Sequence, residues 1–276
     1  EPSTSTALEL TPESRAYLVD LRTTRPRGYG GSSVAIEPLS AEVARFRGGD
    51  GGLEIEVSAV VPEALREQLA GAMQRHREMG YQVVVGGSHP GRLSHNALVV
   101  FEDGSYFELI AWRGPAPAEA WWHLLQQQGE GLIDFALLPH DTAEVIAAAR
   151  ARGLQDIAGP LEGGRQRPDG KALEWTTARQ ATRDLPFLCG DVTPRAWRVP
   201  EGALRQHPNG VKGVSKVKVS VRDLDASVRR YEQFLGPSVS VQREPGLARF
   251  AIQGCVIELQ HRAEAIEGPM GFELKR

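Results

Sequence analysis

The stretch from residue 84 to residue 112, VVGGSHPGRLSHNALVVFEDGSYFELIAW, predicts a β-hairpin that carries a carboxylate at a defined position. An apolar, β-branched strand leads into a turn at 102–105, and the strand pattern resumes over 106–110. Side chains alternate between the two faces of a strand, so Glu108 shares a face with Tyr106. If that face lines a cleft, Glu108 is a ligand or a base; the alternative is an ordinary glutamate that faces solvent.

The composition indicates a globular protein whose partner is a small molecule. Of the 276 residues 41% are hydrophobic and 24% are charged, and the formal net charge is −3. Such a chain has no general attraction to nucleic acid or to an anionic membrane surface. No run approaches the roughly 20 apolar residues that a membrane span requires. The polar start is no signal peptide, and Cys189 and Cys255 form no metal-type cluster, so we expect a cytoplasmic protein with reduced thiols.

A unit of one strand, one helix and three strands recurs along the chain and is clearest at the C-terminal end. A strand is predicted over 214–221, and Asp223 caps a helix that Gly236 ends. Three short strands follow, at about 238–242, 247–252 and 255–260. Glu258 lies at the centre of the last one, as Glu108 does in the opening hairpin.

Two further units precede this one. The opening hairpin closes the first of them, after a predicted helix over 62–79. The second begins with a strand over 132–138, continues with a helix over 141–152 and closes near 172–175. A loop rich in Pro, Gly and Arg follows over 179–212. A loop of this length is either functional or a packed crossover without chemistry.

The N-terminal segment is less regular. Residues 42–46 echo 246–250, which indicates fragments of a fourth unit with a helix over 11–21. A strand at 53–61 either closes that unit or opens the next. The predicted organisation is an irregular segment with a partial module over 1–52, two modules over 53–178, a connector over 179–212 and a C-terminal module over 213–276.

Units of this kind, each closing on an apolar strand with an inward Glu, resemble the vicinal oxygen chelate superfamily, whose paired βαβββ modules curl into a cup. Three passages look like its glyoxalase-like branch: Gly86 to Pro90 with Asn96 and Tyr106 to Ile110; Trp121-Trp122 with Gly131 to Leu137; and Leu185 to Leu188 with Asp191 to Arg195. The resemblance covers about residues 62–262. It implies an α+β fold of repeated βαβββ modules that form curled, cup-shaped mixed sheets, and modules that can pair between chains in a homodimer.

In this superfamily the cup commonly holds one divalent metal, bound by a His or Glu on the first strand of each module and a Glu on the last. The resemblance therefore implies Glu108, Glu258 and Glu56 as ligands of Zn, Fe, Ni or Mn. The first-strand positions depart from the pattern, because Phe135 and Lys216 stand where histidines are usual. A protonated lysine is a poor ligand, so a metal site needs a histidine from elsewhere. The histidines that can supply it are His89, His95 and His207, and Glu174 is a further acidic candidate.

The predicted chemistry is proton transfer on a small oxygenated metabolite, by a lyase or isomerase. A carboxylate removes a proton next to a carbonyl, and a metal or hydrogen-bond donors stabilise the enediolate. Facing carboxylates raise each other's pKa, and burial acts in the same direction, so one can serve as a base near neutral pH. The predicted catalytic residues are Glu108, Glu258 and His89. The predicted substrate-binding residues are Asn96, Trp121, Trp122, Phe187 and His207.

Two other functions fit the same residues. One is a metal-free protein that binds or sequesters a small molecule, which the missing first-strand histidines favour, and the other is a scaffold without a ligand. The glycine-rich stretches at 48–52 and 163–164 match neither a Walker loop nor a dinucleotide fingerprint, so no nucleotide cofactor is expected. A nucleophilic hydrolase is disfavoured because the chain has no Gly-x-Ser-x-Gly elbow.

Overall fold

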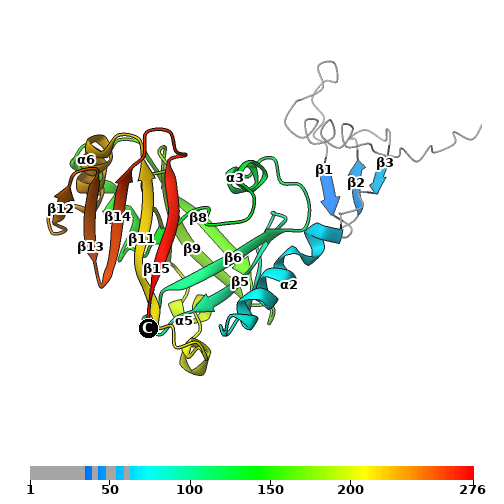
Figure 1. Cartoon of the computed structure of the whole chain (residues 1–276). Helices are drawn as coiled ribbons and strands as arrows, with labels where there is room; N and C mark the ends of the chain where they lie inside the picture. Colours follow the sequence, from blue (N-terminus) through cyan, green and yellow to red (C-terminus); the bar gives the residue numbers. More distant parts are fainter. Residues whose placement is uncertain (1–34, 39–42, 48–53, 59–62) are drawn as a thin grey trace, which may run out of the picture.

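The computed structural model describes residues 35–38, 43–47, 54–58 and 63–276, with side chains from Glu67 onwards. They form three β-sheets, and helices pack against the two larger ones (Figure 1). The helices are α2 (Glu63–Glu78), α3 (Ala120–Gln128), α4 (Thr142–Ala151), α5 (Arg195–Arg198), the short η1 (Gly202–Arg205) and α6 (Leu224–Leu235). None of the helices in these described ranges combines the length and the apolar character that a bilayer span requires.

The strands fall into one small and two large groups. The first sheet has the order β1 (Ala35–Pro38), β2 (Val43–Arg47), β3 (Glu54–Ser58). The second has seven strands in the order β6 (Tyr106–Trp112), β5 (Ser94–Val100), β4 (Val84–Ser88), β8 (Ile157–Gln166), β9 (Ala172–Gln180), β10 (Phe187–Asp191), β7 (Ala136–Leu137). The third has the order β12 (Val241–Glu244), β13 (Leu247–Ile252), β14 (Cys255–His261), β11 (Gly213–Val221), β15 (Gly268–Lys275).

The βαβββ repeat is confirmed in the second and third sheets. In β7-α4-β8-β9-β10 and in β11-α6-β12-β13-β14 the first strand pairs in parallel with the last, and the other pairs within each unit are antiparallel. A parallel pair needs a crossover connection, which α4 and α6 supply. The seven-stranded sheet joins two half-sheets, β4-β5-β6 after α2 and β8-β9-β10-β7 of the second unit, where β4 pairs with β8 at Ser88 and Gln166.

Capping residues fix the helices at the predicted places. The Asp141 side chain accepts from the Glu144 backbone N–H at the start of α4, and Asp223 accepts from Ala226 in the same way at the start of α6. Gly236 ends α6 with a φ of 81°, which favours glycine. The predicted helix over 62–79 is α2. The predicted helix over 11–21 lies outside the described residues.

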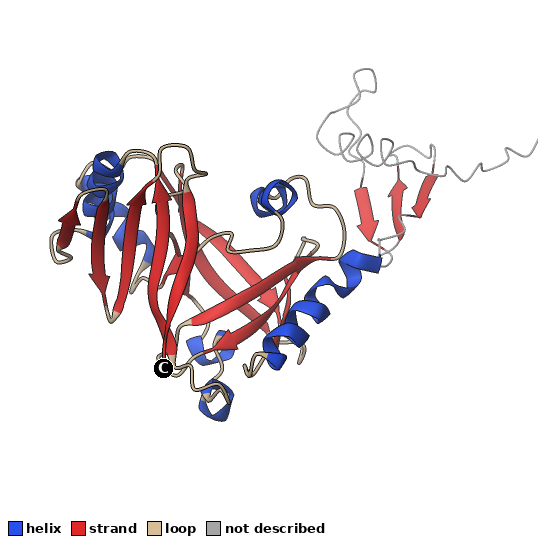
Figure 2. Cartoon of the chain, viewed as in Figure 1, coloured by secondary structure: helices blue, strands red, loops and turns tan. Residues whose placement is uncertain are grey.

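The largest core lies between the second and third sheets, where α4 and α6 pack together. It joins Ile146 and Ala149 of α4 to Tyr231 and Phe234 of α6 and to residues of both sheets, such as Leu188. A smaller core packs α2 against β5 and β6 (Figure 2). α2 and α4 cover one face of the seven-stranded sheet. We call the opposite face the cup face, and it is the face that can hold a site.

The sequence misplaces the end of the second βαβββ unit. Residues 172–175 belong to β9, and the closing strand is β10, which lies inside the predicted connector over 179–212. β10 is short and contains Gly190, and glycine weakens the strand pattern in a sequence. A larger residue would not fit at this position, because an added Cβ atom would lie 2.5 Å from the Thr142 Oγ1 atom. The strand predicted over 132–138 is limited to β7, and β15 is a strand that the sequence does not predict.

Candidate functional site

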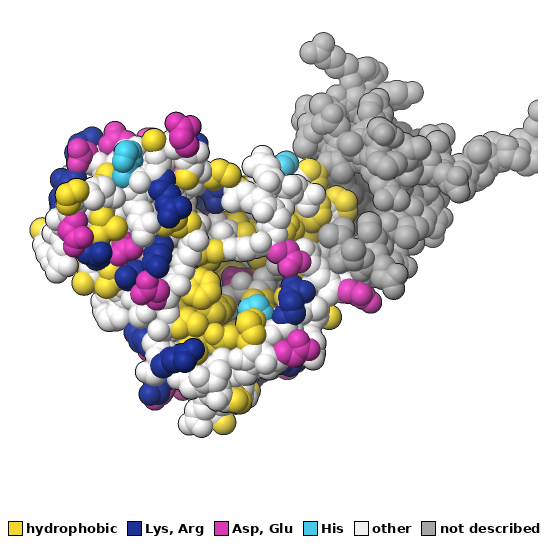
Figure 3. Space-filling view, in the orientation of Figure 1, with side chains coloured by type: hydrophobic (Ala, Val, Ile, Leu, Met, Phe, Trp, Pro, Cys, Tyr) yellow, Lys and Arg dark blue, Asp and Glu magenta, His cyan; other side chains and the backbone are white. Residues whose placement is uncertain are grey.

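The cup face carries the side chain that the opening hairpin predicts. Leu109 of β6 packs with Leu69 and Met73 of α2, so its neighbour Glu108 points to the opposite face. That face is hollowed between β6 and α3, with hydrophobic side chains and a histidine around the opening (Figure 3). The Glu108 side chain is 29% exposed. Its carboxylate is therefore held in the cup and still accessible.

Glu108 is tied to the second half-sheet through one amide. The Asn96 Nδ2 atom donates to Glu108 Oε1 at 2.6 Å, and the Asn96 Oδ1 atom accepts from Arg165 Nη1 at 3.1 Å. Asn96 lies on β5 and Arg165 on β8, so the chain of bonds crosses the junction of the two half-sheets. Asn96 is buried and positions Glu108, which differs from the substrate contact that the sequence predicts for it.

His89 lies beside this carboxylate, with its Nε2 atom 3.8 Å from Glu108 Oε1. Its Nδ1 atom lies 3.2 Å from the Ser94 backbone oxygen, which can only accept, and 3.1 Å from Ser94 Oγ; the tautomer protonated on Nδ1 satisfies both contacts and leaves Nε2 without a hydrogen bond. Burial lowers the pKa of His89, although the charge of Glu108 opposes that shift. His89 is therefore a neutral base next to a carboxylate.

A second polar cluster lies beside the first. Arg198 of α5 donates to Tyr106 Oη at 2.8 Å, to Asp191 Oδ1 at 2.5 Å and to Cys189 Sγ at 3.3 Å. Burial by itself would lower the pKa of Arg198, but Tyr106 and Asp191 outweigh it and raise the pKa. Burial raises the pKa of both Tyr106 and Cys189. Tyr106 thus keeps its proton and lies two residues from Glu108 on the same face.

Aromatic side chains from three elements flank these clusters. Trp121 of α3 lies 5.7 Å from Phe187 of β10 between ring centres, and the Arg179 guanidinium lies over both rings. Trp175 of β9 meets His89 edge to face at 6.3 Å. Trp121 and Phe187 thus come together on one wall. Trp122 does not join them, because it is buried against Trp112.

His207 is a structural residue rather than a substrate contact. Its Nδ1 atom accepts from the Gln82 backbone N–H at 3.0 Å, and its Nε2 atom donates to the Val100 carbonyl at 3.0 Å. The ring is buried between Tyr81 and Phe101. Both ring nitrogens are occupied, so none is left for a ligand.

Glu258 does not meet Glu108, because it belongs to the five-stranded sheet. It accepts from Arg249 Nε at 2.8 Å and lies 3.4 Å from Lys216 Nζ. Burial alone would raise the pKa of Glu258, but Arg249, Gln260 and Lys216 lower it to about 2. An ion-paired carboxylate of this kind is a poor base at neutral pH. Glu56 lies on β3, where side chains are outside the described part, and Glu174 is exposed on β9.

The residues of the cup fit a divalent metal poorly. Within the described ranges, no three His, Cys, Asp or Glu side chains gather as a ligand set. The Glu108 carboxylate is instead bonded to an amide donor that Arg165 polarises from the other side, and a guanidinium repels a cation. Phe135 packs against the main core, and the Lys216 ammonium supplies the positive charge beside Glu258. The cup residues therefore suit proton transfer by protein side chains better than the binding of a divalent metal.

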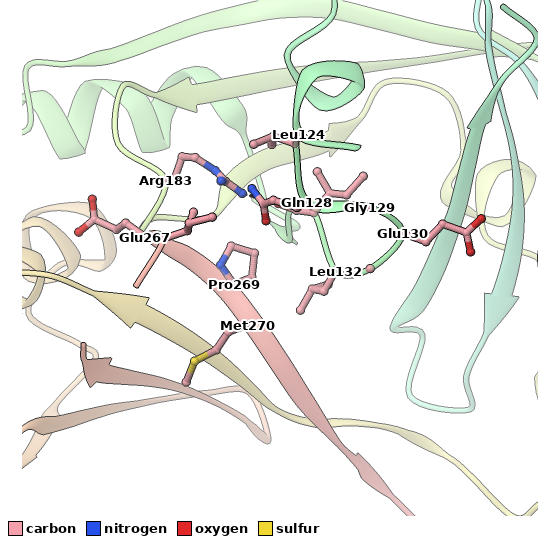
Figure 4. A pocket seen from close by; sticks show the side chains of 12 residues that line it. Leu124, Gln128, Gly129, Glu130, Leu132, Arg183, Glu267, Pro269 and Met270 are labelled. Atoms are coloured by element: carbon pink, nitrogen blue, oxygen red, sulfur yellow. Dashed lines mark hydrogen bonds between the residues drawn. The ribbon is translucent and has the colours of Figure 1, made fainter. Parts of the chain in front are cut away.

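A cavity also lies away from the cup residues, on another part of the molecule. It has a volume of about 270 Å³ between the segment after α3 and the start of β15 (Figure 4). Its acidic residues Glu130 and Glu267 point outward, and Arg183 donates to the Ile133 carbonyl at 3.1 Å. The remaining lining is mostly aliphatic or glycine. With both carboxylates directed away, no base points into this cavity for the predicted chemistry.

Several residues of the cup are not predicted by the sequence: Tyr106, Arg165, Trp175, Cys189 and Arg198. Alternation along β6 does place Tyr106 on the face of Glu108. Arg165 follows two glycines that read as a turn, and its partner Asn96 is 69 residues away. A local sequence pattern cannot predict a contact between residues so far apart in the chain.

The comparisons with known proteins agree on the fold. The family model described as a glyoxalase-like domain matches residues 60–235. A hypothetical protein from Staphylococcus aureus has a similar structure, with a TM-score of 0.56 and 13% identity over 71% of this chain and 83% of that one. A comparison with curated proteins found no match.

Two other solved structures are less similar. A xylose isomerase-like TIM barrel/4-hydroxyphenylpyruvate dioxygenase fusion protein gives a TM-score of 0.44 with 16% identity, over 95% of this chain and 40% of that one. A catechol 2,3-dioxygenase gives 0.21 with 14% identity, over 88% and 87%. Scores this low carry no argument about function. The family model spans more than half of the sequence, and the chain therefore belongs to the glyoxalase-like domain family of the vicinal oxygen chelate superfamily.

Proposed function

We propose that the protein is an enzyme of the lyase or isomerase type that moves a proton on a small oxygenated metabolite bound in the cup. The observation that carries the proposal is the pair of Glu108 and His89. One is a carboxylate fixed by Asn96 and open to the cup, and the other is a neutral imidazole 3.8 Å away with its Nε2 atom free. Two proton acceptors at this spacing can take up a proton and pass it on.

The proposed step begins with removal of a proton from a carbon beside a carbonyl by Glu108. The electron pair of the C–H bond becomes a C=C bond and the π pair of the carbonyl moves to its oxygen. The product is an enolate, or an enediolate where the carbon that loses the proton carries a hydroxyl, and the neutral Tyr106 hydroxyl can stabilise its oxyanion by donating a hydrogen bond. Return of the proton to the neighbouring carbon gives an isomer. Alternatively, the oxyanion electrons re-form the carbonyl while a leaving group departs from the carbon β to it, which gives the product of a lyase. Neither outcome requires an oxidant or a reductant.

A second candidate function is binding or sequestration without turnover. The observation that favours it is the aromatic wall of Trp121 and Phe187, with Arg179 stacked over both rings. Aromatic and guanidinium groups of this kind hold a flat ligand without any chemistry. Both functions use the same cup, so they differ in turnover and not in the place of binding.

The experiment is solvent exchange of protons next to a carbonyl, followed by proton NMR in D₂O. The probes are pyruvate, 2-oxobutyrate and dihydroxyacetone, with the full-length chain before and after dialysis against a chelator. We expect at least one probe to lose its C–H signal faster than without protein, with the same rate after chelation. Exchange at the protein-free rate for every probe overturns the enzyme proposal, and binding of a probe in that case supports sequestration.

A further inference from the structure

Arg165 is a buried cation without an acidic partner in contact. It is 4% exposed, and its two hydrogen bonds go to neutral acceptors, Asn96 Oδ1 at 3.1 Å and the Arg198 backbone oxygen at 3.0 Å. No carboxylate in the described part of the chain forms an ion pair with it. A buried charge of this kind is costly unless something compensates it.

Arg165 is part of the lining of another cavity. It has a volume of about 180 Å³ and is lined by Val84, Val85 and Gly86 of β4, Leu98 of β5, Arg165 of β8, the turn Arg167-Pro168-Asp169, and Trp197 and Pro200. A guanidinium has five N–H donors, and the two bonds of Arg165 use one donor on each Nη atom. The other three make no hydrogen bond within the described part of the chain.

Among the described residues that line this cavity, Arg165 is the one charged group without an ion-pair partner. Arg167 is paired with Asp169 at 3.1 Å and also donates to the Trp197 carbonyl at 3.1 Å. Arg165 remains, and the nearby Lys171 lies 5.3 Å from the Trp197 ring centre. The other lining side chains are apolar or aromatic. A group with a single negative charge and an apolar body matches this combination.

We propose that this cavity binds the carboxylate of a small monoanionic metabolite, with Arg165 as its counter-ion. A carboxylate accepts two parallel bonds from a guanidinium, which explains an arginine here better than a lysine. Burial lowers the pKa of Arg165 and the charge of Glu108 opposes it, so a bound carboxylate offsets the penalty of burial.

The site is connected to the proposed chemistry. Asn96 bonds Arg165 on one side and Glu108 on the other, so an anion at Arg165 lies one amide group from the proposed base. The assignment of this anion as the substrate's own carboxylate rests on the proposed function. The binding site itself does not.

The test is calorimetric titration of the full-length chain with benzoate, benzamide and phenyl phosphate. Benzamide has nearly the shape of benzoate without its charge, and phenyl phosphate carries more charge. We expect benzoate to bind at least about tenfold more tightly than benzamide, because charge-assisted bonds are lost in the amide. We also expect phenyl phosphate to bind more weakly than benzoate. Equal affinity for benzoate and benzamide overturns the proposal, and tighter binding of phenyl phosphate overturns the monoanion assignment.

Variants locate the binding. Arg165→Gln should reduce the preference for benzoate over benzamide to near unity, and Arg165→Lys should keep part of it; Arg229→Gln, at an exposed arginine, is the matched control and should change nothing. If Arg165→Gln does not fold, the proposal is still tested by the Arg165→Lys variant and by the affinities of the wild-type protein for benzoate and benzamide. A full preference for benzoate in a folded Arg165→Gln variant overturns the site. Glu108→Gln should retain benzoate binding, so failure of the proton-transfer proposal is distinguishable from failure of this one.

Discussion

Asn96 donates a 2.6 Å hydrogen bond to Glu108 from the neighbouring strand, and its other amide atom accepts from Arg165. The amide thereby fixes an anion and a cation at the junction of two half-sheets. A side chain that could neither donate nor accept would leave both charged groups without this partner. The geometry of the cup thus depends on one buried amide.

Replacement of Asn96 by leucine, a side chain of similar size, should destabilise the fold by about 1.5–3 kcal/mol, the usual worth of a hydrogen bond to a charged group. Chemical denaturation monitored by circular dichroism measures this change. Gln127→Ala, at an exposed position, is the control and should stay within about 0.5 kcal/mol of wild type. An unchanged midpoint for Asn96→Leu would show that the amide does not fix the cup.

Gly86 leaves the space in which Asn96 and Arg165 meet. A Cβ atom there would lie 2.0 Å from Asn96 Oδ1 and 2.3 Å from Arg165 Nη1. Gly86→Ala should therefore separate the two groups, cost about 1–3 kcal/mol of stability and weaken benzoate binding. Gly131→Ala is the matched control, because a Cβ there meets nothing within 4 Å. Equal effects of the two substitutions would contradict this role.

His207 should matter for stability and not for the ligand. His207→Phe removes the partners of the Gln82 N–H and the Val100 carbonyl, at about 1–3 kcal/mol for each buried group. The exposed His140 provides the control substitution His140→Ala. Denaturation and benzoate titration on the same samples separate the two roles. If a folded His207→Phe variant lost its affinity for benzoate, His207 would have to be assigned to the binding site after all.

Acid should destabilise the fold through its buried histidines. Burial lowers the pKa of His95 from 6.5 to about 4, with Arg113 and His89 acting in the same direction. His95 therefore binds a proton more tightly in the unfolded chain than in the folded one. The folded state has its full stability, as far as His95 is concerned, above pH 6.5 and loses part of it as the pH falls towards 4. His95→Gln should flatten this part of the stability curve, measured by denaturation at pH 7, 5.5 and 4. An equally steep loss in the variant would rule His95 out as a cause.

Local patterns in the sequence predict much of the fold. The hairpin, the cap at Asp223 and the strand-helix-strand repeat each depend on residues close together in the chain. Strands without a strong local signal are missed or misplaced. β10 contains Gly190, and β15 begins with Gly-Pro-Met-Gly, so neither shows the β-branched pattern of a strand.

The site is predicted in part, for a related reason. Alternation along β6 identifies Glu108, and the same local pattern points equally to Glu258. What separates the two carboxylates is their partners from other strands. Asn96 and His89 surround Glu108, whereas Arg249 and Lys216 neutralise Glu258. Pairing between distant segments decides this difference.

The central claim is that Glu108 is the group that moves the proton, and Glu108→Gln tests it most directly. Exchange of the fastest probe and benzoate binding are measured on the same sample, with the exposed Glu162→Gln as the matched control. We expect exchange to fall by at least about 100-fold, the lower range for loss of a general base, while benzoate affinity stays within about threefold of wild type. Exchange at the wild-type rate in a folded Glu108→Gln protein would contradict the account.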